Sequence, residues 1–221
     1  MEESIINNKP WYRRWWGLSL LILLLVLLIW LIGLNIWLYL PNLGNEDNSG
    51  PANPLAYDLD DDPAWGSIDS RITVISFQDY TCSACAEAYP VLKQVQENYS
   101  DKMFFVFRDF PIIGANSTVA ALGAECADEQ GKFWEMHDKL FQNQELISEE
   151  YIRAFASQLE LDLTRFNQCL DNQEQQNEVL NDFNEGYAAG VRATPSFFIN
   201  GRLVSGSLPY AAWEQVVDEY Y

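Results

Sequence analysis

The chain has 221 residues, 48% of them hydrophobic, and a formal net charge of −19 at pH 7. This length suits one ordinary globular domain beside a non-globular N-terminal part, and the apolar content is ample for a core. Such an acidic surface repels nucleic acid, so the composition excludes nucleic-acid binding, and solubility is sufficient to explain the charge.

The N-terminal part contains a long apolar stretch. Residues 18–40 are almost wholly apolar, and no charged residue lies between Arg14 and Glu46. At ~1.5 Å per residue a helix of this length spans ~35 Å, enough to cross a hydrocarbon core of ~30 Å. The alternative is a cleaved signal peptide, whose apolar region is normally shorter and ends in small residues. We predict an N-terminus at 1–16 and an uncleaved transmembrane signal anchor at 17–40.

The residues on either side of this stretch predict its orientation. Lys9, Arg13 and Arg14 precede it and acidic residues follow it, so the positive-inside rule places the N-terminus in the cytoplasm. Residues 41–67 are rich in Pro, Gly, Asn and Asp, and we predict an extracytoplasmic linker there. Its acidic run at 58–62 lacks the spacing of a calcium loop. We therefore expect a single-pass protein of the cell membrane with an extracytoplasmic domain.

The domain predicted at residues 68–221 alternates strands and helices. A strand, a helix and a second strand are followed by a block of five helices, a hairpin with an Asn-Gly turn, and a final helix. Pro90 should kink or divide the first helix. The predicted elements are strands at 72–77 and 103–107 around a helix at 84–98, helices within 117–189, hairpin strands at 196–200 and 202–204, and a helix at 209–220. This order indicates an α/β domain of the thioredoxin type with an all-helical insertion at about 115–190.

Two cysteines lie where the first strand meets the first helix. At this spacing Cys82 and Cys85 can form a small disulfide, and the helix N-terminus favours a thiolate at Cys82. A stabilised thiolate is a good leaving group, so this disulfide would pass readily to another protein. On the cysteine pair alone, a structural disulfide or half of a zinc site stays open. Zinc usually needs four Cys or His ligands, and the only histidine, His137, is more simply explained as a structural residue.

Thr194 and Pro195 directly precede the predicted hairpin. Proline cannot donate to a strand ladder, so it must stand at the start of a strand. In a thioredoxin-type domain this place carries a cis proline beside the cysteine pair, which presents the backbone of Thr194 to an extended peptide and keeps metal from the thiols. An ordinary trans turn proline is the alternative.

Four segments together resemble the DsbA-like thiol:disulfide oxidoreductases of the thioredoxin superfamily, and especially the membrane-anchored proteins of the bacterial envelope. They are FQDYTCSAC (77–85), RDFP (108–111), GKFWEMHD (131–138) and VRATPSFFING (191–201). The resemblance implies that Cys82 is the attacking and leaving thiol, Cys85 the buried resolving thiol and Pro195 the cis proline. It implies no cofactor or metal. The implied partners are reduced exported polypeptides and a quinone-linked membrane oxidase that recycles the pair.

Two departures from the family pattern concern redox chemistry. Ser76 stands where these proteins often carry a glutamate that shuttles the proton of the resolving thiol, so water or Asp79 would have to take this part. Between the cysteines, Ser83 and Ala84 supply no cationic or ring donor. We therefore expect a Cys82 pKa below that of a free cysteine but less depressed than in the strongest oxidants.

The resemblance also suggests a structural disulfide between Cys126 and Cys169. It would close a loop of about 44 residues and stabilise the fold by about 4 kcal/mol. Two buried free thiols are the alternative.

The leading hypothesis is an enzyme that forms disulfides in exported proteins by dithiol–disulfide exchange through Cys82 and Cys85. A disulfide reductase or isomerase is compatible with the same residues. A non-catalytic, chaperone-like module that binds peptides is the alternative from another class.

Overall fold

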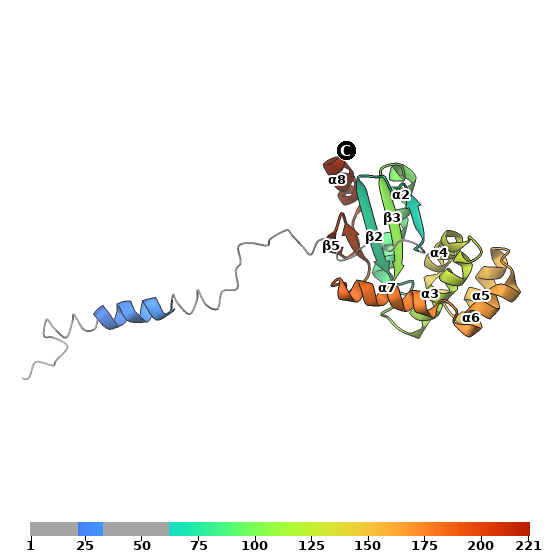
Figure 1. The fold of residues 1–221 in the computed structure, drawn as a ribbon, viewed down its shortest axis with the longest axis horizontal. Coiled ribbons are helices and arrows are strands. Elements are labelled where there is room, and N and C mark those ends of the chain that lie inside the picture. Colours follow the sequence, from blue (N-terminus) through green and yellow to red (C-terminus); the bar gives the residue numbers. More distant parts are fainter. Residues whose placement is uncertain (1–21, 33–61) are drawn as a thin grey trace, which may run out of the picture. The chain divides into compact units, whose positions relative to one another are not determined.

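The computed structural model describes residues 22–32 and 62–221 (Figure 1). The chain divides into two units, Met1–Ser49 and Gly50–Tyr221. Residues 22–32 are helical. Across the two described ranges, no helix combines the length and the apolar character needed to span a membrane. The predicted cytoplasmic N-terminus, the rest of the predicted anchor and most of the predicted linker lie outside the described residues.

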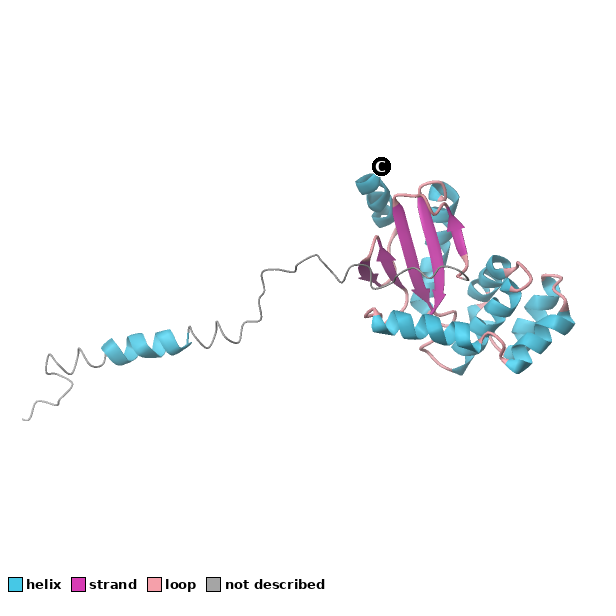
Figure 2. Ribbon diagram, in the orientation of Figure 1, coloured by secondary structure: helices cyan, strands magenta, loops and turns pink. Residues whose placement is uncertain are grey.

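The domain is built on a five-stranded sheet with the strand order β1-β3-β2-β4-β5 (Figures 1 and 2). The two central strands, β2 and β3, are parallel, and every other neighbouring pair is antiparallel. The strands are β1 (Ala64–Gly66), β2 (Ile72–Gln78), β3 (Met103–Asp109), β4 (Ser196–Ile199) and β5 (Arg202–Ser205). β2 and β3 are almost wholly buried, as expected for parallel strands covered on both faces.

Helices cover both faces of this sheet. Val74 of β2 shares a core with Leu92 of α2 (Ser83–Tyr99) and Trp213 of α8 (Tyr210–Tyr220). Successive side chains of a strand point to opposite faces of the sheet. Ile75 and Phe77 of β2 therefore lie on the other face, where they pack with α7 (Gln176–Ala188). A Cβ on Gly186 of α7 would lie 2.6 Å from the Phe77 ring, so glycine allows this helix to approach the sheet closely.

The remaining helices pack together beside the sheet, around a core that also includes Phe107 of β3, Cys85 of α2 and Val179 of α7. They are α3 (Ala115–Asp128), α4 (Phe133–Gln142), the 3₁₀ turn η2 (Gln144–Leu146), α5 (Glu149–Gln158) and α6 (Leu163–Asn172). Cys126 of α3 and Cys169 of α6 form a disulfide in this core, with 5.9 Å between their Cα atoms. The predicted insertion at about 115–190 therefore holds two kinds of helix. Helices α3 to α6 form a separate lobe, whereas α7 belongs to the layer on the sheet.

Two details correct the sequence-based expectations. The predicted linker at 41–67 extends too far, because β1 lies within it and Trp65 stacks on Phe105 with ring centroids 4.8 Å apart. A three-residue strand is too short to give a periodic signal. Helix α2 runs through Pro90 from Ser83 to Tyr99, so of the two outcomes expected there the division of the helix does not occur. Proline has no backbone N–H, so the carbonyl group one turn before it in the helix has no helical partner. Because Pro90 is exposed, water can bind to that carbonyl group instead.

The predicted hairpin between β4 and β5 is confirmed. Asn200 and Gly201 have φ values of 48° and 83°, both in the left-handed region that a two-residue type I′ turn requires. This hairpin places the residues that precede β4 beside the end of β2, because β4 pairs with β2.

Candidate active site

The two cysteines of the CxxC sequence lie at the N-terminus of α2. Cys82 is the N-cap residue and is 8% exposed, whereas Cys85, one turn further on, is fully buried. Both are free thiols in the structure. An incoming group can therefore reach the sulfur of Cys82 before that of Cys85.

The two thiols have opposite pKa shifts. The hydrogen bond from the Cys85 thiol is the largest cause that lowers the pKa of Cys82, which falls to about 5 although burial opposes it. The Thr194 side chain and the backbone N–H groups at the start of α2 add to this lowering. Burial, followed by the hydrogen bond to Cys82, raises the pKa of Cys85 far above its usual range. A Cys82 pKa below that of a free cysteine, as predicted from the sequence, is confirmed.

The loop before β4 forms the opposite wall of the site. The Thr194–Pro195 peptide bond is cis, as expected. The Cys82 thiol donates a hydrogen bond to the carbonyl oxygen of Thr194 at 3.3 Å. The Thr194 hydroxyl is buried and makes no hydrogen bond of normal geometry among the described residues, but it lies close enough to the Cys82 sulfur to lower the pKa of that thiol.

Asp79 holds the turn that leads to Cys82. One oxygen of its buried carboxylate accepts hydrogen bonds from the backbone and side chain of Thr81, at 2.8 and 2.9 Å. The other accepts from the backbone N–H groups of Ile112 and Ile113, at 2.8 and 3.0 Å. The backbone of Asp79 acts to lower the pKa of Cys85, against the larger effect of burial. The carboxylate thus organises the turn, and its four donors leave it poorly placed for the proton-transfer role considered above.

Two further polar residues lie near this turn. Ser76 is fully buried on β2 and accepts a hydrogen bond from the side chain of Gln78 at 2.8 Å. His137 is buried among aromatic rings, including Tyr80, Phe107 and Trp134. Burial lowers the pKa of His137, which favours the neutral imidazole and fits a structural residue.

Sequence reasoning missed Gln144. Its side-chain amide donates hydrogen bonds to the carbonyl oxygens of Tyr80 and Cys82, at 2.9 and 2.8 Å. Gln144 lies 62 residues after Cys82, at the start of the short 3₁₀ turn η2, and no local sequence pattern marks it.

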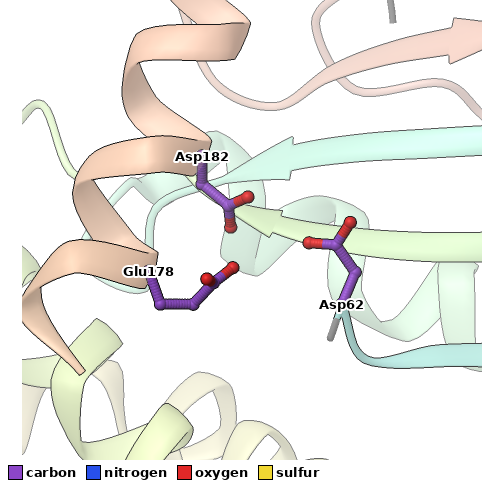
Figure 3. Close-up of side chains that lie close together, drawn as sticks. All are labelled: Asp62, Glu178 and Asp182. Carbon is purple, nitrogen blue, oxygen red and sulfur yellow. The ribbon is translucent and has the colours of Figure 1, made fainter. Parts of the chain in front are cut away.

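A cluster of carboxylates lies on the side of β3 and α7. Asp62, Glu178 and Asp182 bring oxygen atoms within 4.8 Å of one another (Figure 3). The buried guanidinium of Arg108 pairs with Asp62 at 2.5 Å and with Asp182 at 3.7 Å, and also with Glu185. Arg108 therefore supplies positive charge to this cluster, which joins the segment before β1 to β3 and α7.

Comparison with known proteins identifies the family to which this domain belongs. A family model described as thioredoxin matches residues 58–219. The chain belongs to the thioredoxin family. The fold is a thioredoxin fold with an inserted helical region, as predicted, and the domain is similar to DsbA-like thiol-disulfide exchange proteins.

Two solved thioredoxin-fold structures resemble the domain. The thiol-disulfide exchange protein alpha-DsbA2 from Wolbachia pipientis is 26% identical, with a TM-score of 0.67, over 75% of this chain and 89% of that one. A periplasmic thioredoxin-like protein from Salmonella enterica is 23% identical, with a TM-score of 0.62, over 76% of this chain and 93% of that one. At 23% identity, the similarity to the Salmonella protein shows a shared fold alone.

A curated relative is longer than this chain. The Na(+)/H(+) antiporter NhaA 3 of Salinispora tropica is 33% identical over 155 residues, which make up 69% of this chain and 23% of the antiporter. The chain thus spans about a quarter of the length of the curated relatives that it matches.

Proposed function

We propose that this thioredoxin-family protein oxidises pairs of cysteines in exported polypeptides through Cys82 and Cys85. The observation that carries the proposal is the opposite shift of the two thiol pKa values, to about 5 at Cys82 and upward at Cys85. A stabilised Cys82 thiolate favours the reduced pair, and a pair that is stable when reduced is an oxidant when it is a disulfide.

The reaction takes two exchange steps. A substrate thiolate attacks the Cys82 sulfur, the Cys82–Cys85 bond breaks, and the Cys85 sulfur takes the electron pair and then a proton. A second substrate thiolate attacks the substrate sulfur of the mixed disulfide, and Cys82 leaves as a thiolate. The substrate loses two electrons and two protons, and the cysteine pair is reduced. Burial of Cys85 and its raised pKa favour the protonated thiol that the first step produces.

The loop at Thr194 and Pro195 would hold the substrate. In this proposal an extended peptide pairs with the backbone of Thr194, in the manner of an added strand. The contact of 3.3 Å between the Cys82 sulfur and the Thr194 oxygen supports this role, since a peptide at that position passes beside the reactive sulfur.

The proposed location is the outer side of a cell membrane. The predicted anchor at residues 17–40 would hold the domain there, with the N-terminus in the cytoplasm. The disulfide between Cys126 and Cys169 supports an oxidising compartment, because such bonds are rare where thiols are kept reduced. A membrane redox partner would then reoxidise the pair after each cycle.

Trapping of mixed disulfides tests the proposal. In cells that produce Cys85→Ala, Cys82 should form lasting mixed disulfides with exported proteins, because no Cys85 thiol is present to attack the Cys82 sulfur and release the bound protein. The double variant Cys82→Ala/Cys85→Ala is the matched control and should trap none. A peptide-binding module without thiol chemistry would trap nothing in either variant, and binding by Cys82→Ser would be unchanged.

A further inference from the structure

Gln144 connects the helical lobe to the backbone of the reactive cysteine. Its Nε2 atom donates to the carbonyl oxygen of Tyr80 at 2.9 Å and to that of Cys82 at 2.8 Å. Carbonyl oxygens only accept hydrogen bonds, so the amide must present its nitrogen, with both hydrogens, to this turn. One side chain of the lobe thus spans the turn that joins β2 to α2.

The segment that carries Gln144 is itself anchored. The side chain of Asn143 donates to the carbonyl oxygen of Lys139 in α4 at 2.8 Å. The side chain of Asn116 in α3 donates to the carbonyl oxygen of the buried Ile147 at 3.0 Å. Gln144 therefore reaches the turn from a base tied to two helices of the lobe.

The carbonyl group of Cys82 also begins the active-site helix. It accepts the first hydrogen bond of α2, from the N–H of Ala86 at 3.1 Å. The N–H groups that lower the pKa of Cys82 belong to Ala84 and Cys85 in this same first turn. A bond that fixes the Cys82 carbonyl therefore also fixes the sulfur relative to the donors that stabilise its thiolate.

We propose that Gln144 is a positioning residue of the dithiol site, whose two hydrogen bonds hold the Cys82 sulfur against the start of α2 and Thr194. The inference rests on the proposed exchange through Cys82. According to this inference, the helical lobe helps to set the reactivity of Cys82, in addition to shaping the surface around the active site.

Gln144→Met tests this role, because methionine keeps the unbranched side chain but cannot donate. The matched control is Gln142→Met, since the Gln142 amide donates to the Tyr89 hydroxyl at 2.9 Å, away from the turn. We expect the midpoint of Cys82 thiolate titration in Gln144→Met to rise by about one pH unit, a tenfold loss of thiolate below the midpoint. Gln142→Met should titrate as the wild type does.

Gln144→Glu provides a second variant of nearly unchanged shape. Its carboxylate cannot donate and adds a negative charge, so the midpoint should rise at least as far as in Gln144→Met. Equal melting temperatures of the variants would show that the fold is retained. Wild-type titration in both Gln144 variants would overturn the inference. Loss of mixed-disulfide trapping by Cys85→Ala would overturn the proposed function instead, because the titration of Cys82 does not depend on any substrate.

Discussion

Hydrogen bonds to a single sulfur account for the reactivity of Cys82. Thr194→Val removes the hydroxyl that helps to lower the Cys82 pKa, while it keeps the carbonyl group that contacts the sulfur. We expect the pKa to rise, with about tenfold less thiolate at a pH below the midpoint. Ultraviolet absorbance of the thiolate during a pH titration measures this. Thr164→Val, at an exposed position of α6, is the control, and an unchanged midpoint in Thr194→Val would contradict the account.

The lowered pKa of Cys82 also predicts how the stability of the reduced protein depends on pH. The unfolded chain holds this proton more tightly than the folded protein does, so the stabilisation is complete above the unfolded pKa of about 8.5 and is lost as the pH falls through about 5. The disulfide form has no such group. The melting temperature of the reduced form minus that of the oxidised form should therefore increase from about pH 4 to about pH 7. Other acids titrate in both forms and cancel. Cys82→Ser has neither the thiolate nor the disulfide, so its melting temperature should be the same in reducing and in oxidising buffer at each pH.

At the scale of elements, the ion pairs of Arg108 hold β3, α7 and the segment before β1 together. Arg108→Met would leave the carboxylates of Asp62 and Asp182, 2% and 7% exposed, without their cation. We expect the free energy of unfolding to fall by about 3–5 kcal/mol, because an unpaired buried charge is costly. Arg165→Met breaks an exposed pair with Glu129 and should cost about 0–1 kcal/mol. Equal losses for the two variants in denaturant titrations would contradict this assignment.

The disulfide between α3 and α6 is expected to stabilise the helical lobe without taking part in exchange. It links residues separated by 43 positions, so its removal in Cys126→Ala/Cys169→Ala should lower the free energy of unfolding by about 4 kcal/mol in the chain-entropy account. Both cysteines are buried, so an incoming thiol cannot reach their sulfurs. Below the melting temperature, the thiolate titration of Cys82 should therefore match the wild type, and a changed titration would show that the bridge acts on the active site.

For the molecule as a whole, local signals predicted most of the fold. The runs that form β2 and β3, the Asn-Gly turn and the spacing of Cys82 and Cys85 are short-range patterns, and each appears in the structure. The meeting of Cys82 with Thr194, 112 residues apart, was expected from family resemblance and not from any local pattern.

Contacts between distant polar side chains could not be predicted in this way. The hydrogen bonds of Gln144 and the pairing of Asp62 with Arg108 depend on how separate elements pack, and a single polar residue gives no periodic signal. The segment before β1 was expected to be solvated because its acidic run looks like a linker. The buried guanidinium that receives Asp62 lies 46 residues later in the chain.

The reduction potential of the Cys82–Cys85 pair tests the central claim most directly. It can be measured by equilibrating the purified domain with reduced and oxidised glutathione, because the buried Cys126–Cys169 bridge should not exchange. With a Cys82 pKa of about 5, the account predicts an oxidising pair, with a potential nearer to about −120 mV than to about −270 mV. A potential at or below about −270 mV would mark the pair as a reductant and contradict the proposed direction of electron flow.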